Sequence, residues 1–416
     1  MKEELHLFIL WKNSLDKKEV ILEDIKSKFK IVKMYNVTWS DEKYSENLSR
    51  FYGVKLLKDS EKEKHCGKGT FFLVIVKDKN PKYDYRNTTA GKAYVNINMF
   101  DSKTKYRELT GGGHKVHCTN SVEETNHDLT LLLGKNVEDY LNEIGNNKNK
   151  EEIIELSGDL FGSDGFNSVE DMFYALNNCV NYAILRNYET LPNEIYVNKH
   201  NDIDIICESR ENTSYILNAK KAQDLDYRVQ YYVKVGDKTA NFDLRYIGDK
   251  YYDEKLERDI LKNRVWNEKG FYTLSSDDYF YTLLYHALIH KLEFSNDYKE
   301  RLMKMKKEFT KEIANSYEKS ASFLEEWMVK NRYIVTSPID QTVIYNNNML
   351  EYMEPLVYKK DIEEEQLLSE NKLLKEKLIE VENLANDFKD RLNIITNSRT
   401  WKYTEFIRKL NKIIKK

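Results

Sequence analysis

The sequence predicts a multidomain protein of mixed α/β and α+β class that ends in a coiled coil, and three observations lead to this prediction. The chain has 416 residues, enough for two or three domains that each bury a core. Segments with strand-like and helix-like apolar spacing alternate through most of it. Near its end, apolar residues recur every seven positions. We expect domains at 1–145 and 151–355, a coiled coil at 360–397 and a basic amphipathic tail at 398–416.

Composition indicates a polar surface and limits the partners. Hydrophobic residues make up 41% and charged residues 32%, and the net charge is −3. That charge argues against broad nucleic-acid binding, which needs a basic surface. The four cysteines lie far apart without a C-x-x-C, as expected for reduced thiols rather than a zinc site. Neither a secretory signal nor an apolar run of membrane-spanning length is visible, so we expect a cytoplasmic protein.

The first 145 residues fit a small α/β domain. Ser40 is the expected N-cap of a helix that Gly53 would stop. Ser121 and Glu124 form a capping box for a later helix that ends at Gly134. The expected elements before that helix are a strand at 5–11, a helix at 17–29, a strand at 31–39, a helix at 41–52, and strands at 69–77 and 94–100.

A glycine-rich turn precedes the capped helix and is a candidate nucleotide or phosphate site. Glycines in such a turn can place backbone N–H groups around a phosphate, and basic or imidazole groups would add to it. A flexible hairpin followed by core histidines is the alternative. The turn consists of Gly111, Gly112, Gly113, His114, Lys115 and His117, and its polar neighbours, which could supply a base, are Glu123, Glu124, His127 and Asp128.

Part of this turn resembles the ParB and sulfiredoxin superfamily, whose members carry a G-G-x-H-R or G-x-H-R turn before a helix. The matching residues are Gly112, Gly113, His114 and Lys115, with Lys in place of the usual Arg. The resemblance implies that residues 1–145 bind ATP and phosphorylate a small molecule. Lysine cannot reproduce the bidentate fork of arginine.

The second domain contains a D-x-D strand. Asp202 and Asp204 lie two apart among isoleucines, so a strand would place both carboxylates on one face. Two such groups repel unless a cation lies between them, and Mg²⁺ prefers these ligands. With Asp243 from a later apolar run, they could hold Mg²⁺ for an in-line displacement at phosphorus. An Asp pair ending an edge strand is the alternative. Around them we expect a linker at 145–150, helices at 169–187 and 215–222, strands at 227–235 and 240–246, and a helix-rich region from Asp253.

Residues 165–305 resemble the polymerase-β-like nucleotidyltransferases found with bacterial cell-surface polysaccharide genes. The resemblance implies that Asp202 and Asp204 are metal ligands and Asp243 the third carboxylate. The family's Gly-Ser turn is replaced by Leu185-Arg186-Asn187, and Arg186 could supply the charge for a phosphate. The motifs shared with the family consist of Leu185, Arg186, Glu189, Leu191 and Pro192, then Asp202 and Asp204, then Asp243 to Asp249, and finally Tyr285, His286, His290 and Lys291.

Two of these residues suggest a further contact. His290 and Lys291 could face the nucleotide phosphates from a helical lobe, while His286 could equally be a core histidine. Zinc is not expected there, because the H-E-x-x-H glutamate is missing.

The C-terminal segment predicts self-association. Its heptads between Leu367 and Ile395 are typical of a homodimeric coiled coil. From Ser398 to Lys416 there are seven Lys or Arg and one acid, as in peripheral membrane anchors at the inner face of a membrane. The tail also resembles the S-x-S-W-R-x-T-x-P-x-R ending of many surface-polysaccharide glycosyltransferases. Folding back onto the body is the alternative.

The acidic residues and the resemblance to nucleotidyltransferases together imply a Mg²⁺-dependent nucleotidyl- or phosphotransferase that uses a nucleoside triphosphate, ATP or CTP. The resemblance further implies that it acts on a sugar or polyol in cell-surface polysaccharide biosynthesis. One alternative is an ATP-dependent small-molecule kinase centred on Gly111–His117. The other is a non-catalytic scaffold for glycosyltransferases.

Overall fold

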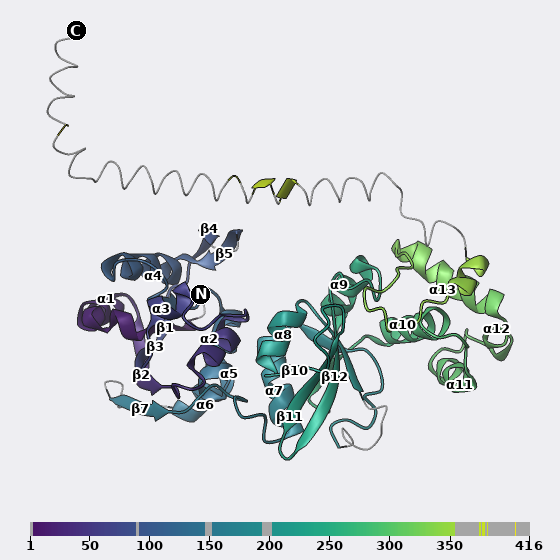
Figure 1. The fold of residues 1–416 in the computed structure, drawn as a ribbon, viewed down its shortest axis with the longest axis horizontal. Helices are drawn as coiled ribbons and strands as arrows, with labels where there is room; N and C mark the ends of the chain where they lie inside the picture. The colour runs from purple at the N-terminus through teal and green to yellow at the C-terminus, as the bar shows by residue number, and fades with distance from the viewer. Residues whose placement is uncertain are drawn as a thin grey trace, which may run out of the picture. The chain divides into compact units, whose positions relative to one another are not determined.

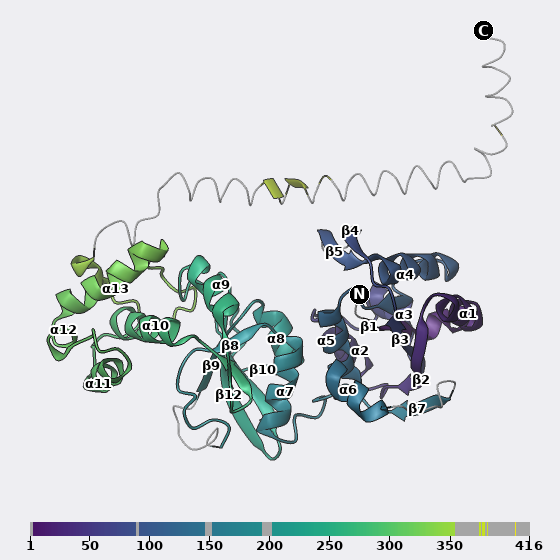
Figure 2. The same cartoon turned by 180° about the vertical axis from the view of Figure 1, so that it is seen from behind.

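The computed structural model describes residues 3–88, 91–145, 152–193 and 202–353, together with positions 374, 375, 377, 378, 381 and 404. It divides into two units, Met1–Met353 and Glu354–Lys416. Most of the linker, the coiled coil and the basic tail lie outside the described residues. Figures 1 and 2 show the first unit as helices packed around sheets, which confirms the mixed α and β class.

The first sheet has the strand order β6-β1-β3-β2-β7. Apolar side chains on one face of it pack against α1 and α4, and those on the other face join a larger core with α2 and α5. Its strands are β1 (Glu4–Leu10), β2 (Lys30–Thr38), β3 (Phe71–Asp78), β6 (Val116–Cys118) and β7 (Ile153–Ser157), with a separate hairpin of β4 (Tyr83–Thr88) and β5 (Gly91–Asn96). The helices are η1 (Lys12–Lys17), α1 (Lys18–Lys28), α2 (Tyr44–Tyr52), α3 (Glu61–Cys66), α4 (Ile97–Leu109), α5 (Val122–Leu133) and α6 (Val137–Ile144).

Three expectations for this region were wrong in part. The strand predicted at 94–100 ends at Asn96, whose side chain accepts hydrogen bonds from the first amides of α4 and so starts a helix there. Ser40 does not cap α2, because its N–H and hydroxyl both bind Asp159. Strand β7 follows the expected linker yet pairs with β2, so the first sheet extends past the predicted boundary at 145.

The second sheet has the order β10-β11-β12-β9-β8-β14-β13. Figures 1 and 2 show α7 and α8 on one side of it and the helical segment from α9 to α13 on the other. Its strands are β8 (Tyr182–Ile184), β9 (Asp202–Cys207), β10 (Lys220–Lys221), β11 (Gln230–Val235), β12 (Lys238–Tyr246), β13 (Val265–Asn267) and β14 (Phe271–Thr273). The helices are α7 (Val169–Cys179), α8 (Arg210–Ile216), α9 (Glu254–Asn263), α10 (Ser276–Ile289), α11 (Asn296–Met305), α12 (Lys311–Ala314), α13 (Tyr317–Asn331) and η2 (Asn347–Tyr352).

The predicted strands at 227–235 and 240–246 are confirmed as β11 and β12. The helix predicted at 169–187 was too long. It ends at Cys179, because the apolar residues that follow form β8 and pair with β9. The helix expected at 215–222 lies earlier, as α8, where Ser209 caps it.

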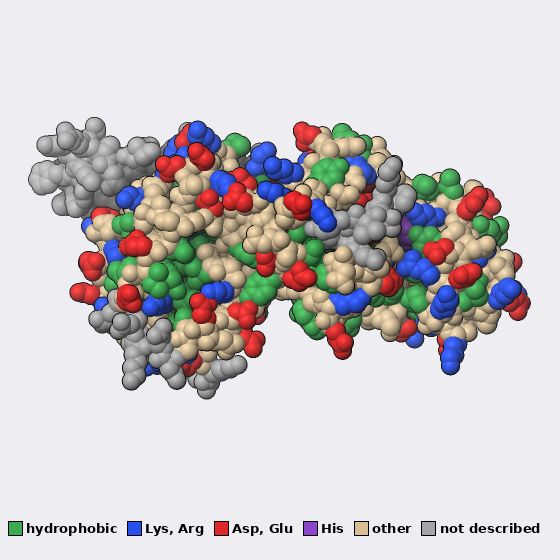
Figure 3. Space-filling view, turned by 90° about the horizontal axis from the view of Figure 1, so that it is seen from below, with side chains coloured by type: hydrophobic (Ala, Val, Ile, Leu, Met, Phe, Trp, Pro, Cys, Tyr) green, Lys and Arg blue, Asp and Glu red, His purple; other side chains and the backbone are tan. Residues whose placement is uncertain are grey.

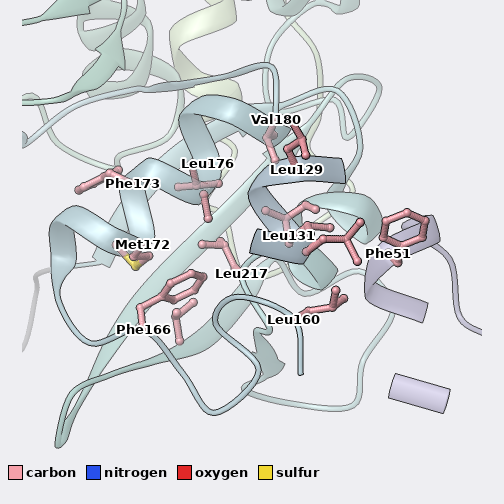
Figure 4. Close-up of a cluster of buried hydrophobic side chains, with 14 of the residues drawn as sticks. Phe51, Leu129, Leu131, Leu160, Phe166, Met172, Phe173, Leu176, Val180 and Leu217 are labelled. Carbon is pink, nitrogen blue, oxygen red and sulfur yellow. The ribbon is translucent and has the colours of Figure 1, made fainter. Parts of the chain in front are cut away.

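The two sheets share one hydrophobic core rather than forming separate domains. Figure 4 shows Leu129 and Leu131 of α5 gathered with Met172 and Leu176 of α7 and with Leu217, which follows α8. The buried guanidinium of Arg50, from α2, donates to the carbonyls of Phe161, Tyr215 and Ile216. Packing and hydrogen bonds therefore join the regions that the sequence separated at 145.

Candidate functional site

The three predicted aspartates lie on two neighbouring parallel strands. In the pairing of β9 with β12, Asp204 lies opposite Asp243 and Asp202 lies opposite Asn241. Alternate residues of a strand share a face, so Asp202, Asp204 and Asp243 point to the same side of the sheet. The other face carries apolar residues such as Ile203, which pack in the shared core. Acidic and apolar residues therefore alternate along β9 as expected, and Asp243 of β12 lies beside Asp204.

Arg186 reaches this face from the segment after β8. Its Nη2 donates to Asp204 Oδ1 at 2.9 Å, and both side chains are about nine-tenths buried. Burial opposes ionisation of Arg186, but Asp204 together with the neighbouring tyrosines offsets this and raises the arginine's pKa well above its ordinary value. The structure thus pairs Arg186 with a predicted metal ligand, whereas the sequence assigned it to a phosphate.

A second guanidinium lies beside Asp243. The Nη2 of Arg245 is 3.7 Å from Asp243 Oδ2, and its Nη1 lies 3.7 Å from Asp249 and 3.6 Å from Asp340. Arg228 also contacts Asp340, at 3.3 Å. Three arginines therefore face four carboxylates in a buried network that is nearly balanced in charge.

Asp243 is the most accessible of the network's paired acids, with 21% of its side chain exposed against 10% for Asp204. Burial raises the pKa of Asp243, and the neighbouring charge of Asp204 raises it further, despite the opposing effect of Arg245. Asp204 and Asp243 thus influence each other's ionisation, and the pKa of Asp243 is raised. Such a pair is typical of sites that take up a proton or a cation.

The helical segment contributes tyrosine and histidine rings to this face. The Tyr251 ring lies 4.2 Å from the guanidinium carbon of Arg245 and 5.7 Å from that of Arg186. Its hydroxyl is 2.8 Å from Nδ1 of His286, and its ring centre lies 4.2 Å from that of His290 at an interplanar angle of 42°.

The two histidines contact Tyr251, and their surroundings disfavour the protonated, cationic form. Burial lowers the pKa of both well below the usual value, and the positive charge of Arg186 lowers it further. His286 fits the alternative of a core histidine with a hydrogen-bond partner. The backbone carbonyl of Lys291 accepts a hydrogen bond from Asn346, which anchors the segment after α10.

The glycine turn of the first sheet, the candidate phosphate site, follows the C-terminal end of α4. The N–H groups of Gly111 and Gly112 donate to the carbonyls of Glu108 and Arg107, so they close the C-terminal end of α4. All three glycines, including Gly113, have positive φ values between 76° and 85°. Two of the three amides are thus committed to a helix end, where the local dipole disfavours an anion.

The side chains after the glycines are likewise held by the protein. Lys115 Nζ donates to the carbonyl of Thr110 at 2.7 Å. His117 Nε2 lies 2.7 Å from Asp128 Oδ2. Burial lowers the pKa of His114, and the positive charges of Lys62 and Arg107 contribute to this. Those two cations come from other helices, and no motif in the sequence pointed to them.

No family model, curated protein or solved structure matches this chain. Among the described helices, none has the length and apolar character needed to cross a bilayer. On the face drawn in Figure 3, Lys and Arg side chains are interspersed with Asp and Glu, as on a mixed-charge surface. A functional proposal therefore rests on the face of the second sheet that bears Asp202, Asp204 and Asp243.

Proposed function

We propose that this protein is a Mg²⁺-dependent nucleotidyl- or phosphotransferase that uses a nucleoside triphosphate and acts on a sugar or polyol hydroxyl in cell-surface polysaccharide biosynthesis. The observation that carries the proposal is the register of β9 and β12, which sets Asp243 opposite Asp204 with Asp202 on the same face. The choice of ATP or CTP as the nucleotide, and of a sugar or polyol as the acceptor, rests on the resemblance of the motifs around Arg186 and Asp243 to those of the nucleotidyltransferases.

The donor set suits a hard divalent cation. Carboxylate oxygens are the protein ligands that Mg²⁺ prefers, and it would supply charge for the phosphates of the donor. Within the described residues, Asp202, Asp204 and Asp243 do not form a group whose ligand atoms all lie within 4.8 Å of one another. Metal binding would therefore require side-chain rotation, and release of Asp204 Oδ1 by Arg186 is the rearrangement that the ion pair suggests.

The remaining side chains fit the other needs of the transfer. Asp243, with its raised pKa and its partial exposure, is suited to accept the proton of the attacking hydroxyl. Arg186, once off Asp204, would carry its charge to the phosphates of the donor, in the role that the sequence predicted for it. The neutral imidazoles of His286 and His290 hold Tyr251 against both arginines and so position them.

The test uses Asp243→Asn in the full-length chain. Release of pyrophosphate or nucleoside diphosphate from ATP or CTP is measured with Mg²⁺ across a panel of sugars and polyols. We expect a loss of about 10²-fold or more, the range for a lost acid–base group. Asp243 is preferred to Asp204, because removing Asp204 leaves Arg186 buried without its partner. Asp224→Asn, at a fully exposed aspartate, is the matched control. Equal turnover by both variants rejects the proposal.

One observation favours a second candidate, a non-catalytic scaffold for glycosyltransferases. The ion pair between Arg186 and Asp204 already neutralises a predicted metal ligand without a metal. A scaffold of this kind would gain no thermal stability from any nucleotide in the presence of Mg²⁺, because a ligand must stabilise the state that it binds. Stabilisation that depends on Mg²⁺ and is lost in Asp243→Asn favours the enzyme.

A further inference from the structure

A compact group of metal-ligand side chains lies in the first sheet's region, away from the proposed transfer site. The ligand atoms of His117, Glu124 and Asp128 all lie within 4.8 Å of one another. Within the described residues this is the one such group of three or more. His117 comes from β6, and the two acids come from α5.

Local structure brings these residues together. Glu124 and Asp128 are four apart on α5, so they lie one above the other on the same helix face. Ser121 caps the helix and fixes where it begins, by accepting from the N–H of Glu124. Leu129 and Leu131 of the same helix are buried in the shared core, as Figure 4 shows. The face that carries the acids is therefore rigidly placed.

The imidazole rings are fixed as well. The ring of Phe51 lies 5.3 Å from that of His117 and 6.4 Å from that of His127, and Tyr52 contacts His117 at 5.8 Å. His127 Nδ1 lies 2.9 Å from Asp128 Oδ1, on the oxygen that His117 does not contact. This is the arrangement of an outer partner that orients a carboxylate ligand.

Charge gives the second reason to expect an ion. Asp128 has 3% of its side chain exposed, and a buried carboxylate needs a compensating charge. Glu124 adds a second carboxylate to the group, and one divalent cation would match the combined charge of the two acids. Glu124 is only half-buried, so an ion could enter past it.

We propose that His117, Glu124 and Asp128 bind one divalent transition-metal ion, with His127 orienting Asp128. An ion about 2.1 Å from each ligand atom spans atom pairs up to about 4.2 Å apart, so ligand atoms that lie within 4.8 Å of one another need only a small contraction. Binding would also displace the hydrogen between His117 Nε2 and Asp128 Oδ2. One imidazole and two carboxylates favour Zn²⁺ or Mn²⁺ over Ca²⁺ or Mg²⁺, which prefer oxygen alone. Three protein ligands leave open positions for water or an anion.

The experiment titrates the full-length chain, stripped with EDTA, with Zn²⁺ or Mn²⁺ alone in a calorimeter, and uses the absorption spectrum of Co²⁺ as a second readout. We expect one ion per chain. Glu124→Gln should weaken binding at least ten-fold, and His127→Ala should weaken it about 10- to 100-fold, as for an outer partner.

Glu123→Gln is the matched control, since Glu123 is the exposed neighbour of Glu124 on the same helix turn. It should leave the affinity unchanged. Glu124→Gln keeps an oxygen for the amide of Asn120, so the variant should fold, and a circular dichroism melt checks this. Absence of binding, several weak sites per chain, or equal affinity in Glu124→Gln and Glu123→Gln would each overturn the proposal.

Discussion

Two buried groups of carboxylates in this protein are neutralised by different chemistry. Asp204 and Asp243 on the second sheet face the guanidinium groups of Arg186 and Arg245. Asp128, beside the first sheet, lies between two imidazoles. Arginine keeps its proton at every accessible pH, whereas imidazole loses its proton near neutrality. An ion at His117, Glu124 and Asp128 would have to replace only the hydrogen between His117 Nε2 and Asp128 Oδ2, whereas at the second sheet the whole Arg186 side chain must move off Asp204.

The largest effect is expected from breaking the arginine pair. Arg186→Met leaves Asp204 buried without a partner, which should lower the free energy of unfolding by about 3–5 kcal/mol. The double variant Arg186→Met with Asp204→Asn removes both charges and should recover most of this loss. Urea denaturation of both variants measures these changes in the free energy of unfolding. Wild-type stability in Arg186→Met would show that the pair contributes nothing.

The same variants sharpen the proposal for the transfer site. If the arginine holds the place of a cation, Mg²⁺ should stabilise Arg186→Met more than it stabilises the wild type, because the vacated Asp204 gains a ligand role. Thermal melts with and without Mg²⁺ give the comparison. An identical Mg²⁺ response in the two proteins contradicts this interpretation.

The next effect concerns a carboxylate that is neutralised by a proton. Burial, with the charge of Asp249, raises the pKa of Glu257 from its ordinary 4.5 to about 9. Between these values the folded state binds a proton that the unfolded state has lost, so stability should fall as the pH rises, by at most about 1.4 kcal/mol per pH unit. Glu257→Gln keeps a neutral side chain and should remove this slope. Unfolding curves at several pH values check it, and an unchanged slope in the variant refutes the assignment.

The smallest effect is expected at the turn that leads to the first-sheet group. Gly112→Ala and Gly113→Ala both place a side chain at positive φ, which costs about 1–2 kcal/mol. At Gly113 the added Cβ would also lie 2.9 Å from the ring of His65, whereas at Gly112 it meets open space. Gly113→Ala should therefore be the less stable of the two in a thermal melt. The reverse order would mean that His65 moves aside freely.

Patterns of local origin were predictable from the sequence. Alternating apolar residues gave β9 and β12, and hence the common face of Asp202, Asp204 and Asp243. The capping residue Ser121 and the stop at Gly134 were also predicted, because both act through backbone groups within one helix turn.

Long-range partners were not predictable. The pairing of β7 with β2 and the contact of Asp340 with Arg245 join residues that are far apart in the chain. Arg186 was recognised as a cation, but only the fold shows that its partner is Asp204. Arg245 was the missed residue with a visible signal, since it lies two positions after Asp243 and so shares its strand face.

The single core that α5, α7 and α8 build has a consequence for dissecting this protein. A fragment cut near residue 145 would carry Leu129 and Leu131 of α5 without the side chains that cover them, and would be prone to aggregate. The two sheet regions should melt in one transition, so a ligand held by one of them would protect the other against proteolysis. Loss of activity in a truncated protein could therefore reflect unfolding of the shared core, whereas point substitutions leave that core in place.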